Sequence, residues 1–564
     1  MEKKFKTIIV RLTPNHSSLY DDVNLSSINS KKVKEFINVI KNSYTQLEEN
    51  GFIYVYGNPS VVSYFVGKYL NDNKELFLRY WIAINTNENY EKENTLARNH
   101  MAAIMLLRSD SKSIDLDTES CRTMRFACPA CGKNSKDWGG KKHLLNVKGV
   151  AISDVWNDFV NVQSSIHDKD LDELILNISD NTNSCNFDET IPEDILNRML
   201  KLTKSQNNYK EVLVDDCMIP IPTKSSSVLI EKAPFTEENT VYCGDSVEKM
   251  KELANKYPNG LFDLVFADPP YNLNKDYNNY DDTNSDESYN EWCKEWLLLC
   301  FKLLKPSGHM LILNLPKWTV RNIQFLIDNG ATVQDCIVWD AMSTPMGKVM
   351  PAHYSLIDFT KGNPKETFIN SKIYPALNYC LRPACIKQRN SLNSKMIPVS
   401  NIWSDLHRIK HKKDRDEHPC QLPDHLMDRI VNMFSLEEDL VFDPFCGAGT
   451  TALAAIRNKR NYFTIDISPE YVNIATKKIE ELKTQGAVIR HPEIKAKRKV
   501  SKKKMELYVQ KLMLTLGKKI EDDELVSVLY GDENAGFSKE DIIDTYGSIH
   551  QLIKKCSFVV RKNI

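Results

Sequence analysis

Residues 264–271 read Leu-Val-Phe-Ala-Asp-Pro-Pro-Tyr, an apolar run followed by a carboxylate, two prolines and an aromatic ring. The run predicts a buried strand of a parallel sheet. Open α/β sheets bind ligands at the carboxyl ends of their strands, which is where Asp268 and Tyr271 fall. Since proline lacks a backbone donor, carbonyl oxygens beside it stay free as acceptors. The segment suits a site that holds a planar group by an exocyclic amine, and a strand ending in a plain Pro-Pro turn is the alternative.

A second motif lies near the end of the chain. Residues 440–451 read Leu-Val-Phe-Asp-Pro-Phe-Cys-Gly-Ala-Gly-Thr-Thr, which predicts a strand, a glycine turn and the start of a helix. Glycines let the backbone approach a ligand closely, and a helix N-terminus favours negative groups. The next predicted strand, 462–465, ends in Asp466, a position from which a carboxylate can accept hydrogen bonds from ribose hydroxyls. Together the two motifs predict an α/β fold that binds a nucleoside-containing ligand.

The two motifs and their order resemble the β class of S-adenosylmethionine-dependent DNA amino methyltransferases. In that class the catalytic half comes first, a target-recognition segment follows and the cofactor half comes last. The resemblance covers roughly residues 240–482. It implies a Rossmann-like α/β methyltransferase sheet in the circularly permuted β-class order. It also implies S-adenosyl-L-methionine as the cofactor and double-stranded DNA as the partner, with a cognate restriction endonuclease as a further candidate partner.

Site residues are carried over from the family position by position. The catalytic residues implied are Asp268, Pro269, Pro270 and Tyr271. The cofactor-binding residues implied are Asp245, Ala267, His418, Asp443, Phe445, Gly447, Gly449, Thr450 and Asp466. The element at 418–423 departs from the family, because Cys420 stands in place of Thr and Leu422 in place of Lys. The second change removes any contact made through that ammonium group and leaves the class unchanged.

The expected reaction needs neither a metal nor a covalent enzyme intermediate. Flipping the target base out of the duplex costs a few kcal/mol, of which stacking on Tyr271 returns roughly 1–3 kcal/mol. Asp268 and a proline carbonyl accept hydrogen bonds from the amine and aim the nitrogen lone pair at the sulfonium methyl. Proximity and orientation then supply several kcal/mol of the barrier.

The family pattern also bears on the target base. Asp before Pro-Pro-Tyr goes mostly with N6-adenine, whereas Ser goes mostly with N4-cytosine. We therefore expect a site-specific DNA methyltransferase that acts on adenine N6, with N4-cytosine or RNA methylation as alternatives. An alternative of another class is a sequence-specific DNA-binding protein whose catalytic half has failed. The intact Asp268, Tyr271, Gly447 and Gly449 argue against it.

Length and composition bound the remaining possibilities. The chain of 564 residues suggests three to four domains and has a formal net charge of −1, so DNA affinity must come from local patches. No apolar stretch approaches the ~18 residues that span a bilayer. The basic first residues are not followed by the apolar segment of a signal peptide, so no secretory signal is expected. Fourteen cysteines without a scaffold spacing indicate reduced thiols. We expect a cytoplasmic, nucleoid-associated protein with no membrane partner.

The first 220 residues contain a weak repeat of the catalytic half. Five segments recur in the same order: 51–59 with 308–316, 99–108 with 352–361, 129–131 with 383–385, 153–158 with 400–405, and 192–198 with 423–429. The first copy has Leu12-Thr13-Pro14-Asn15 in place of Asp268 to Tyr271, and it has no glycine turn. It is therefore expected to be catalytically dead. It could complete an intrachain pseudo-dimer or merely stabilise the active half, and a homodimer is the alternative assembly.

The expected organisation follows from the repeat. It comprises a degenerate methyltransferase-like domain at 1–222, a linker at 223–232, a catalytic methyltransferase domain at 233–486 and a basic, mainly helical extension at 487–564. The target-recognition segment is expected at about 363–417.

Basic residues of that segment are the candidate DNA contacts. They are Arg382, Lys387, Arg389, Arg408, Lys410 and Lys412. Arginine and lysine read guanine in the major groove but more often bind phosphate, which is the interpretation favoured for 407–413. No catalytic metal is expected. Cys128 and Cys131 have a spacing found in structural zinc sites, although such a pair also arises by chance.

Overall fold

The computed structural model describes most of the two sheets and their helices. Described are residues 3–13, 25–122, 151–156, 191–215, 234–341, 349–362, 397–406, 421–485, 502–516, 520–531 and 548–560, with short gaps inside 25–122 and 234–341 and a few isolated residues elsewhere. The chain divides into two compact units, Met1–Ala487 and Val488–Ile564. The division falls where the basic extension was expected to begin.

The larger sheet of the first unit has eight strands in the order β16-β12-β13-β11-β8-β17-β18-β7. The strands are β7 (Thr240–Cys243), β8 (Phe262–Ala267), β11 (Leu304–Asn314), β12 (Thr332–Asp340), β13 (His353–Thr360), β16 (Ile402–Trp403), β17 (Leu440–Asp443) and β18 (Asn461–Asp466). All neighbours are parallel except β13, which runs antiparallel to both β11 and β12. This mostly parallel sheet between helices confirms the predicted α/β fold class.

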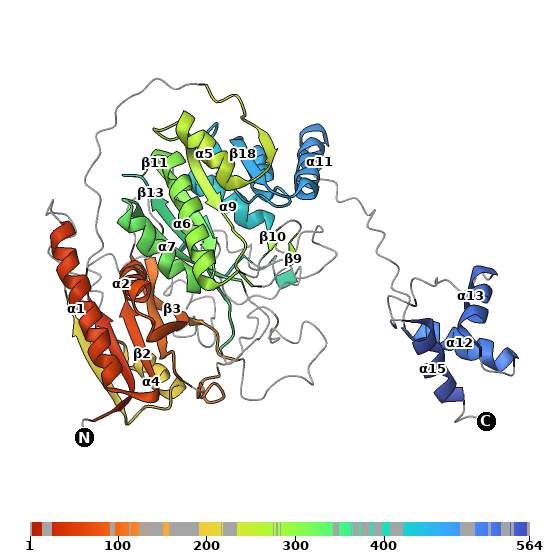
Figure 1. The fold of residues 1–564 in the computed structure, drawn as a ribbon, viewed down its shortest axis with the longest axis horizontal. Coiled ribbons are helices and arrows are strands. Elements are labelled where there is room, and N and C mark those ends of the chain that lie inside the picture. The colour runs from red at the N-terminus through yellow and green to blue at the C-terminus, as the bar shows by residue number, and fades with distance from the viewer. Residues whose placement is uncertain are drawn as a thin grey trace. The chain divides into compact units, whose positions relative to one another are not determined.

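Helices cover this sheet, and two short ribbons flank it. The helices are α5 (Ser246–Lys256), α6 (Asp286–Leu303), α7 (Pro316–Asp328), α9 (Asp424–Phe434), α10 (Thr450–Arg457) and α11 (Pro469–Gln485). The ribbons pair β9 (Asp276–Tyr277) with β10 (Tyr280–Asp281), and β14 (Lys372–Ile373) with β15 (Ile397–Pro398). Figure 1 shows α6 and α7 lying side by side over β11 and β13, and residue contacts join these elements.

Aromatic stacking holds the central strands in the core. The rings of Phe262 and Phe442, on neighbouring strands, stack with their centroids 4.2 Å apart, and Phe463 of β18 lies 5.9 Å from Phe442. All three side chains are fully buried. Each would bury roughly 150–250 Å² of surface, so these strands are fixed side by side by packing as well as by their backbone hydrogen bonds.

The second sheet has six strands in the order β5-β3-β4-β2-β1-β6. The strands are β1 (Phe5–Leu12), β2 (Leu47–Gly57), β3 (Leu76–Tyr90), β4 (Arg98–Arg108), β5 (Val155–Trp156) and β6 (Tyr209–Val214), and the helices of this half are α1 (Leu25–Thr45), α2 (Pro59–Asp72) and α4 (Glu193–Leu202). The order corresponds strand for strand to β16-β12-β13-β11-β8-β17, so both halves share one topology. Within the described residues, the smaller sheet contains no strands equivalent to β18 and β7.

Local irregularities recur at matching places in the two sheets. The register shifts between Leu78 and Tyr80 in β3, and between Val333 and Asp335 in β12. An added Cβ at Gly51 would lie 3.0 Å from a backbone carbonyl of the neighbouring strand, and one at Gly308 would lie 2.9 Å from the matching carbonyl. Shared bulges and shared close approaches are features that a common fold retains. The exact limits of 1–222 and 233–486 remain a prediction, since both halves lie in one compact unit.

The register corrects one pairing expected from the sequence. In the smaller sheet Thr7 pairs with Phe52, and the corresponding pair in the larger sheet is Leu264 with His309. Thr7 therefore corresponds to Leu264. Four residues further along each strand, Arg11 occupies the position of Asp268. The sequence comparison had placed Leu12 there and was wrong by one residue. Arg11 Nε lies 3.5 Å from an oxygen of Glu211. A cation thus occupies the catalytic carboxylate's place in the first half.

The two halves touch through reciprocal contacts. Asp154 Oδ1 accepts hydrogen bonds from the backbone N–H groups of Ala352 and His353, at 2.8 and 3.1 Å. The matching Asn401 Oδ1 accepts one from the Asn99 N–H at 3.2 Å and lies 3.0 Å from His100 Nδ1. Each half therefore inserts the same turn into the same place of the other.

The second unit is a small helical cluster. It contains α12 (Lys502–Leu516), α13 (Asp522–Gly531) and α15 (Ile549–Val560). Its buried core includes Met505, Val509, Leu552 and Ile553, each no more than 1% exposed. These helices agree with the mainly helical extension expected from the sequence. Among the described residues, no helix is both long and apolar enough to cross a membrane.

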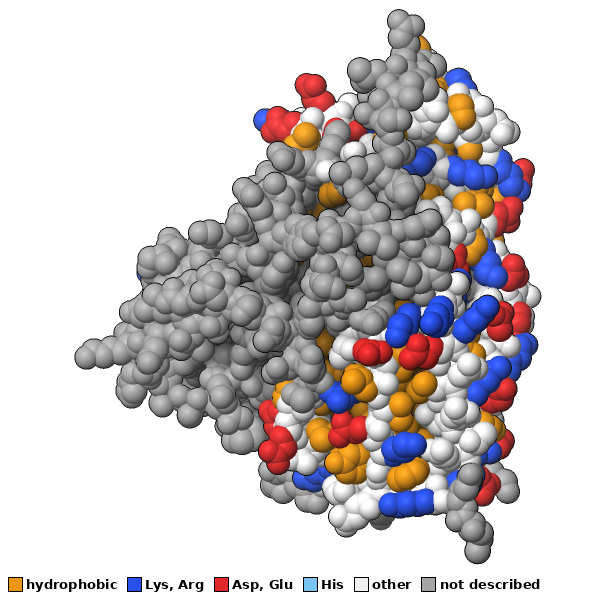
Figure 2. Space-filling model, turned by 90° about the vertical axis from the view of Figure 1, so that its left-hand side faces the viewer, with side chains coloured by type: hydrophobic (Ala, Val, Ile, Leu, Met, Phe, Trp, Pro, Cys, Tyr) orange, Lys and Arg blue, Asp and Glu red, His pale blue; other side chains and the backbone are white. Residues whose placement is uncertain are grey.

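Charges on the surface are mixed in sign. Figure 2 shows lysine and arginine side chains interspersed with aspartate and glutamate on the face that lies to the left in Figure 1. This agrees with the formal net charge of −1. A broad field of one sign is therefore not what this described face would present to a charged partner.

We predict that Asp154→Asn stabilises the chain more at pH 8 than at pH 5. Burial raises the pKa of Asp154 to about 7, above its ordinary value of 3.8, despite hydrogen bonds from two backbone N–H groups. Ionising this group therefore opposes folding, and the cost grows as the pH rises from about 4 to 7. Asparagine keeps the accepting Oδ1 without the charge. Denaturant unfolding at the two pH values measures the effect, with the exposed Asp72→Asn as the control. Equal effects at both pH values would contradict it.

Candidate active site

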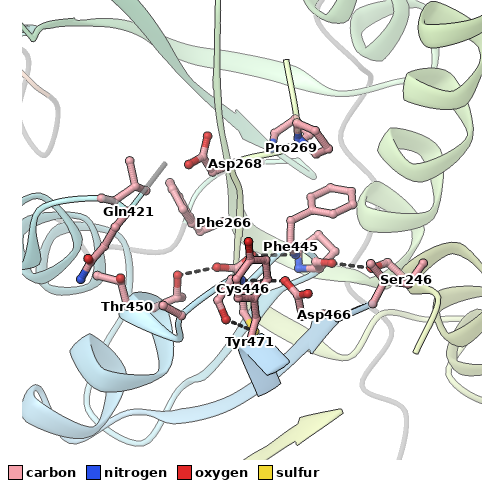
Figure 3. A pocket seen from close by; sticks show the side chains of 18 of the residues that line it. Ser246, Phe266, Asp268, Pro269, Gln421, Phe445, Cys446, Thr450, Asp466 and Tyr471 are labelled. Atoms are coloured by element: carbon pink, nitrogen blue, oxygen red, sulfur yellow. Dashed lines mark hydrogen bonds between the residues drawn. The ribbon is translucent and has the colours of Figure 1, made fainter. Parts of the chain in front are cut away.

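Three carboxylates meet at one edge of the larger sheet. Strands β8, β17 and β18 are neighbours and run parallel, so their carboxyl ends share an edge. Asp443 and Asp466 end two of these strands, and Asp268 follows the third. All three line one pocket of about 1070 Å³, a volume that includes space open to solvent. Figure 3 shows Asp268 and Asp466 on the walls of this pocket.

Most of the predicted catalytic and cofactor-binding residues line this pocket. They are Asp245, Asp268, Pro269, Pro270, Tyr271, Asp443, Phe445, Gly447, Thr450 and Asp466. Asp245 also caps α5, because its side chain accepts a hydrogen bond from the Glu248 N–H at 3.0 Å. The Asp-Pro-Pro-Tyr segment and the glycine turn, which are far apart in the chain, are therefore brought together.

The glycine turn depends on glycine at two positions. Gly447 has a φ of +49° and Gly449 a φ of +82°. Residues that carry a Cβ rarely adopt these backbone conformations. An added Cβ at Gly449 would also lie 2.6 Å from Ala475 Cβ in α11. The turn is tied to the neighbouring strand, since the Gly447 N–H donates to Asp466 Oδ2 at 2.8 Å. The backbone therefore lines the pocket without side chains in the way.

Asp443 is held inside the turn that it begins. Its carboxylate accepts hydrogen bonds from the Phe445 N–H, at 2.9 Å, and from the Thr451 hydroxyl. Both donors belong to the loop and helix that follow the strand. Asp443 thus fixes the path of the chain from β17 into α10.

Burial makes these carboxylates hard to ionise. It raises the pKa of Asp268 and of Asp443 to about 7 each, and it raises the pKa of Asp466 as well. The charge of Asp443 raises the pKa of Asp268 further, while the hydrogen bond from Tyr271 lowers it. The described lining includes no lysine or arginine. A ligand that carries positive charge would therefore be favoured in this pocket.

Two predicted residues lie just behind the pocket. Ala267 is fully buried in β8 and does not line it, whereas Phe266 does. Side chains alternate along a strand, so Phe266 and Asp268 share a face that Ala267 does not. Gly449 packs against α11 instead of facing the pocket. The predicted cofactor contacts of Ala267 and Gly449 stay predictions, since neither residue is among those that line the pocket.

Several predicted positions lie outside the described residues. These are His418, the DNA-contact candidates Arg382, Arg389, Arg408, Lys410 and Lys412, and Cys128. Lys387 is described and exposed, and Cys131 is half-buried. Within the described ranges, no group of three or more His, Cys, Asp or Glu side chains is placed to hold a metal ion.

The pocket also includes residues that were not among the predicted catalytic and cofactor-binding residues. They are Ser246, Val247, Phe266, Trp292, Gln421, Leu422, Pro444, Cys446, Ala448, Thr451, Ile467 and Tyr471. Some had a signal in their position, since Ser246 follows the predicted Asp245 and Thr451 follows the predicted Thr450. Trp292 had none, because only the folded chain brings α6 over the glycine turn, with the Trp292 and Phe445 ring centroids 5.6 Å apart.

Comparison with protein families places the site in a known context. A family model described as DNA methylase matches residues 262–477. A second, described as D12 class N6 adenine-specific DNA methyltransferase, matches residues 424–545. The first match contains the Asp-Pro-Pro-Tyr segment, the glycine turn and Asp466.

Curated relatives match the same half of the chain. Type II methyltransferase M.BamHI of Bacillus amyloliquefaciens is 32% identical over 258 residues, which are 43% of this chain and 59% of the relative. Type II methyltransferase M.HpaI of Haemophilus parainfluenzae is 31% identical over 247 residues, 43% of this chain and 74% of the relative. DNA adenine methyltransferase YhdJ of Escherichia coli (strain K12) is 29% identical over 257 residues, which are 43% of this chain and 83% of the relative.

We predict that Gly449→Ala destabilises the chain more than Gly330→Ala. Both glycines have a positive φ, +82° and +90°, and a strained backbone costs about 1–3 kcal/mol. Only Gly449 adds a clash, because nothing lies within 4 Å of an added Cβ at Gly330. Equilibrium unfolding in denaturant measures the two losses of free energy. Equal losses would show that the approach of α11 does not require glycine here.

Proposed function

The chain belongs to the DNA methylase family, and on this premise we propose that it transfers a methyl group from S-adenosyl-L-methionine to N6 of adenine in DNA. The observation that supports this most is the shared pocket. Asp268 and Tyr271 line it together with the glycine turn and Asp466. A base and a methyl donor bound there would lie next to each other, which is the proximity that an in-line transfer needs.

The residues of the pocket fit the proposed cofactor. S-adenosyl-L-methionine supplies a methyl group activated by a positively charged sulfur. Gly447 offers backbone without a side chain, and Asp466 would accept hydrogen bonds from the ribose hydroxyls. Buried acids favour a cationic ligand, because its charge offsets the cost of ionising them. Phe445 would offer the methyl donor an apolar wall.

The Asp-Pro-Pro-Tyr segment would hold the flipped base. Asp268 accepts a hydrogen bond from the exocyclic amine, and a proline carbonyl accepts the other. These bonds orient the nitrogen lone pair toward the methyl group. The ring of Tyr271 offers a stacking face worth roughly 1–3 kcal/mol. The Tyr271 hydroxyl donates to Asp268 Oδ1, so the amine would share or replace that donor.

Adenine is favoured as the target base by two similarities. The D12 class model that matches 424–545 is described as N6 adenine-specific, and the relative YhdJ is named a DNA adenine methyltransferase. Mass spectrometry of nucleosides from duplex DNA methylated by the purified full chain tests the assignment. We expect N6-methyladenine. N4-methylcytosine, or methylation of RNA in preference to duplex DNA, would replace the proposal by one of its alternatives.

We predict that Asp268→Ala lowers turnover severely but keeps cofactor binding. Loss of one positioned acceptor removes the orientation of the amine, and such losses cost on the order of 10²–10³ in kcat. The dissociation constant of S-adenosyl-L-methionine should rise far less than kcat falls, because Asp443, Asp466 and the glycine turn remain. Single-turnover methyl transfer and calorimetry measure the two quantities, with Asp72→Ala as a distant control. Methylation at the wild-type rate would remove Asp268 from the mechanism.

We predict that the preference for S-adenosyl-L-methionine over S-adenosylhomocysteine rises with pH. Asp268 and Asp443, each with a pKa raised to about 7 by burial, are mostly neutral at pH 6 and mostly ionised at pH 8. Only the ionised carboxylates attract the sulfonium, which the second ligand lacks. Calorimetric titrations of both ligands between pH 6 and pH 8 measure the ratio of affinities. A constant ratio would show that these acids do not sense the sulfur charge.

The two halves would form an intrachain pseudo-dimer. In a twofold dimer, residues near the axis meet their own counterparts. Gly67 of α2 corresponds to Gln324 of α7, 257 positions later, and an added Cβ at Gly67 would lie 2.6 Å from Gln324 Cβ. The reciprocal contacts of Asp154 and Asn401 follow the same symmetry. The degenerate half would thus take the place of a second subunit.

Further partners follow from the proposed reaction. Double-stranded DNA is the substrate, and the exposed Lys387 is a candidate phosphate contact. A restriction endonuclease of the same sequence specificity is a candidate partner, because the relatives M.BamHI and M.HpaI are named Type II methyltransferases. Such an enzyme would work in the cytoplasm at the nucleoid, where its DNA lies.

A further inference from the structure

The catalytic loop is held from behind by two aromatic side chains. The Tyr289 hydroxyl, on α6, donates to the Pro270 carbonyl at 2.5 Å, and Trp318 Nε1, in the first turn of α7, donates to the Tyr271 carbonyl at 3.0 Å. Tyr289 and Trp318 are 1% and 2% exposed, and their ring centroids lie 4.4 Å apart. This pair, the loop clamp, already donates to the Pro270 carbonyl, so the Pro269 carbonyl is favoured as the proline acceptor for an amine.

The helix that carries Trp318 is packed against the degenerate half. An added Cβ at Gly67 of α2 would lie 2.7 Å from the carbonyl oxygen of Val320, two residues after Trp318. At the other end of α7, the Tyr64 hydroxyl donates to Asp328 Oδ1 at 3.2 Å. The two helices therefore cross so closely that α7 has little freedom to move away from α2.

A second contact from the degenerate half reaches the same tyrosine. Asp154 holds the backbone N–H of His353, and the next residue, Tyr354, lies with its ring centroid 5.9 Å from that of Tyr271. Trp339 packs on the other flank of Tyr354, at 5.5 Å. The backbone and the ring of Tyr271 are thus each supported by an element that the degenerate half touches.

We propose that the degenerate half acts as a positioning subunit for the catalytic loop, through the packing of α2 on α7 and the bond from Trp318 to Tyr271. Gly67 and Trp318 are positioning residues in this account, since neither lines the pocket. The half that has lost its own chemistry keeps the second half's base-holding segment in place. Its contribution would appear in turnover and not in cofactor affinity, because the glycine turn lies on other elements.

A double-mutant cycle on the full chain tests whether the packing of α2 on α7 acts on the catalytic loop through Trp318. Gly67→Val forces α7 away from α2, and Trp318→Phe removes the hydrogen bond to the loop together with part of the buried ring. We expect each to lower kcat by about tenfold, the effect of one lost hydrogen bond, with less than a twofold change in S-adenosyl-L-methionine affinity. Together they should lower kcat little more than either alone. If the loss of kcat in the double mutant is the product of the two single losses, the proposal is overturned.

Two further arms keep the test decisive. Asn71→Ala, exposed near the end of α2, should leave kcat unchanged, and Tyr64→Phe perturbs the same helix pair more gently if Gly67→Val does not fold. The kinetic arm rests on the proposed methyl transfer, whereas hydrogen exchange does not. Faster exchange of the Tyr271 and Asn272 amides in Gly67→Val than in Asn71→Ala supports the clamp even if no methyl transfer is found. Unchanged exchange would contradict it.

Discussion

The shared direction of β8, β17 and β18 is the constraint on which the site depends. Parallel strands place their carboxyl ends at one edge, and each of these strands ends in or is followed by an aspartate. Bringing three acids into a buried edge makes their ionisation unfavourable, as the raised pKa values of Asp268 and Asp443 indicate. A cationic ligand offsets that cost, so the same geometry would favour the positively charged cofactor.

The two halves show how one topology can keep or lose chemistry. Six strands have the same order in both sheets, and the same bulge recurs in β3 and β12. At the position of Asp268 the first half has Arg11, which pairs with Glu211. A guanidinium has donors only, so Arg11 cannot accept a hydrogen bond from an amine as Asp268 can. The first half retains its packing against the second. Through α7, this packing supports the residue Trp318, which donates to the catalytic loop.

Much of this site could be predicted from the sequence because its signals are local. Apolar runs that end in aspartate predict the strand ends, and glycines followed by a helical stretch predict the turn near Gly447. Errors came where local signals say nothing about direction or register. Ala267 was expected at the pocket that its neighbour Phe266 lines, and Leu12 was paired where Arg11 stands.

The loop clamp could not have been predicted in the same way. Tyr289 and Trp318 are distant in sequence from the loop that they hold, and only the packing of α6 and α7 brings them to it. Gly67 did carry a signal, since an isolated glycine inside a helical pattern suggests a close approach. What it approaches is known only from the folded chain.

Titration of the full chain with S-adenosyl-L-methionine tests the central claim most directly, because it counts the sites where a cofactor fits. The glycine turn and the acidic edge are present in the second half, and Arg11 with Glu211 replaces that edge in the first. The account predicts one binding site per chain. No binding would contradict the assignment of the pocket, and two sites per chain would contradict the degeneracy of the first half.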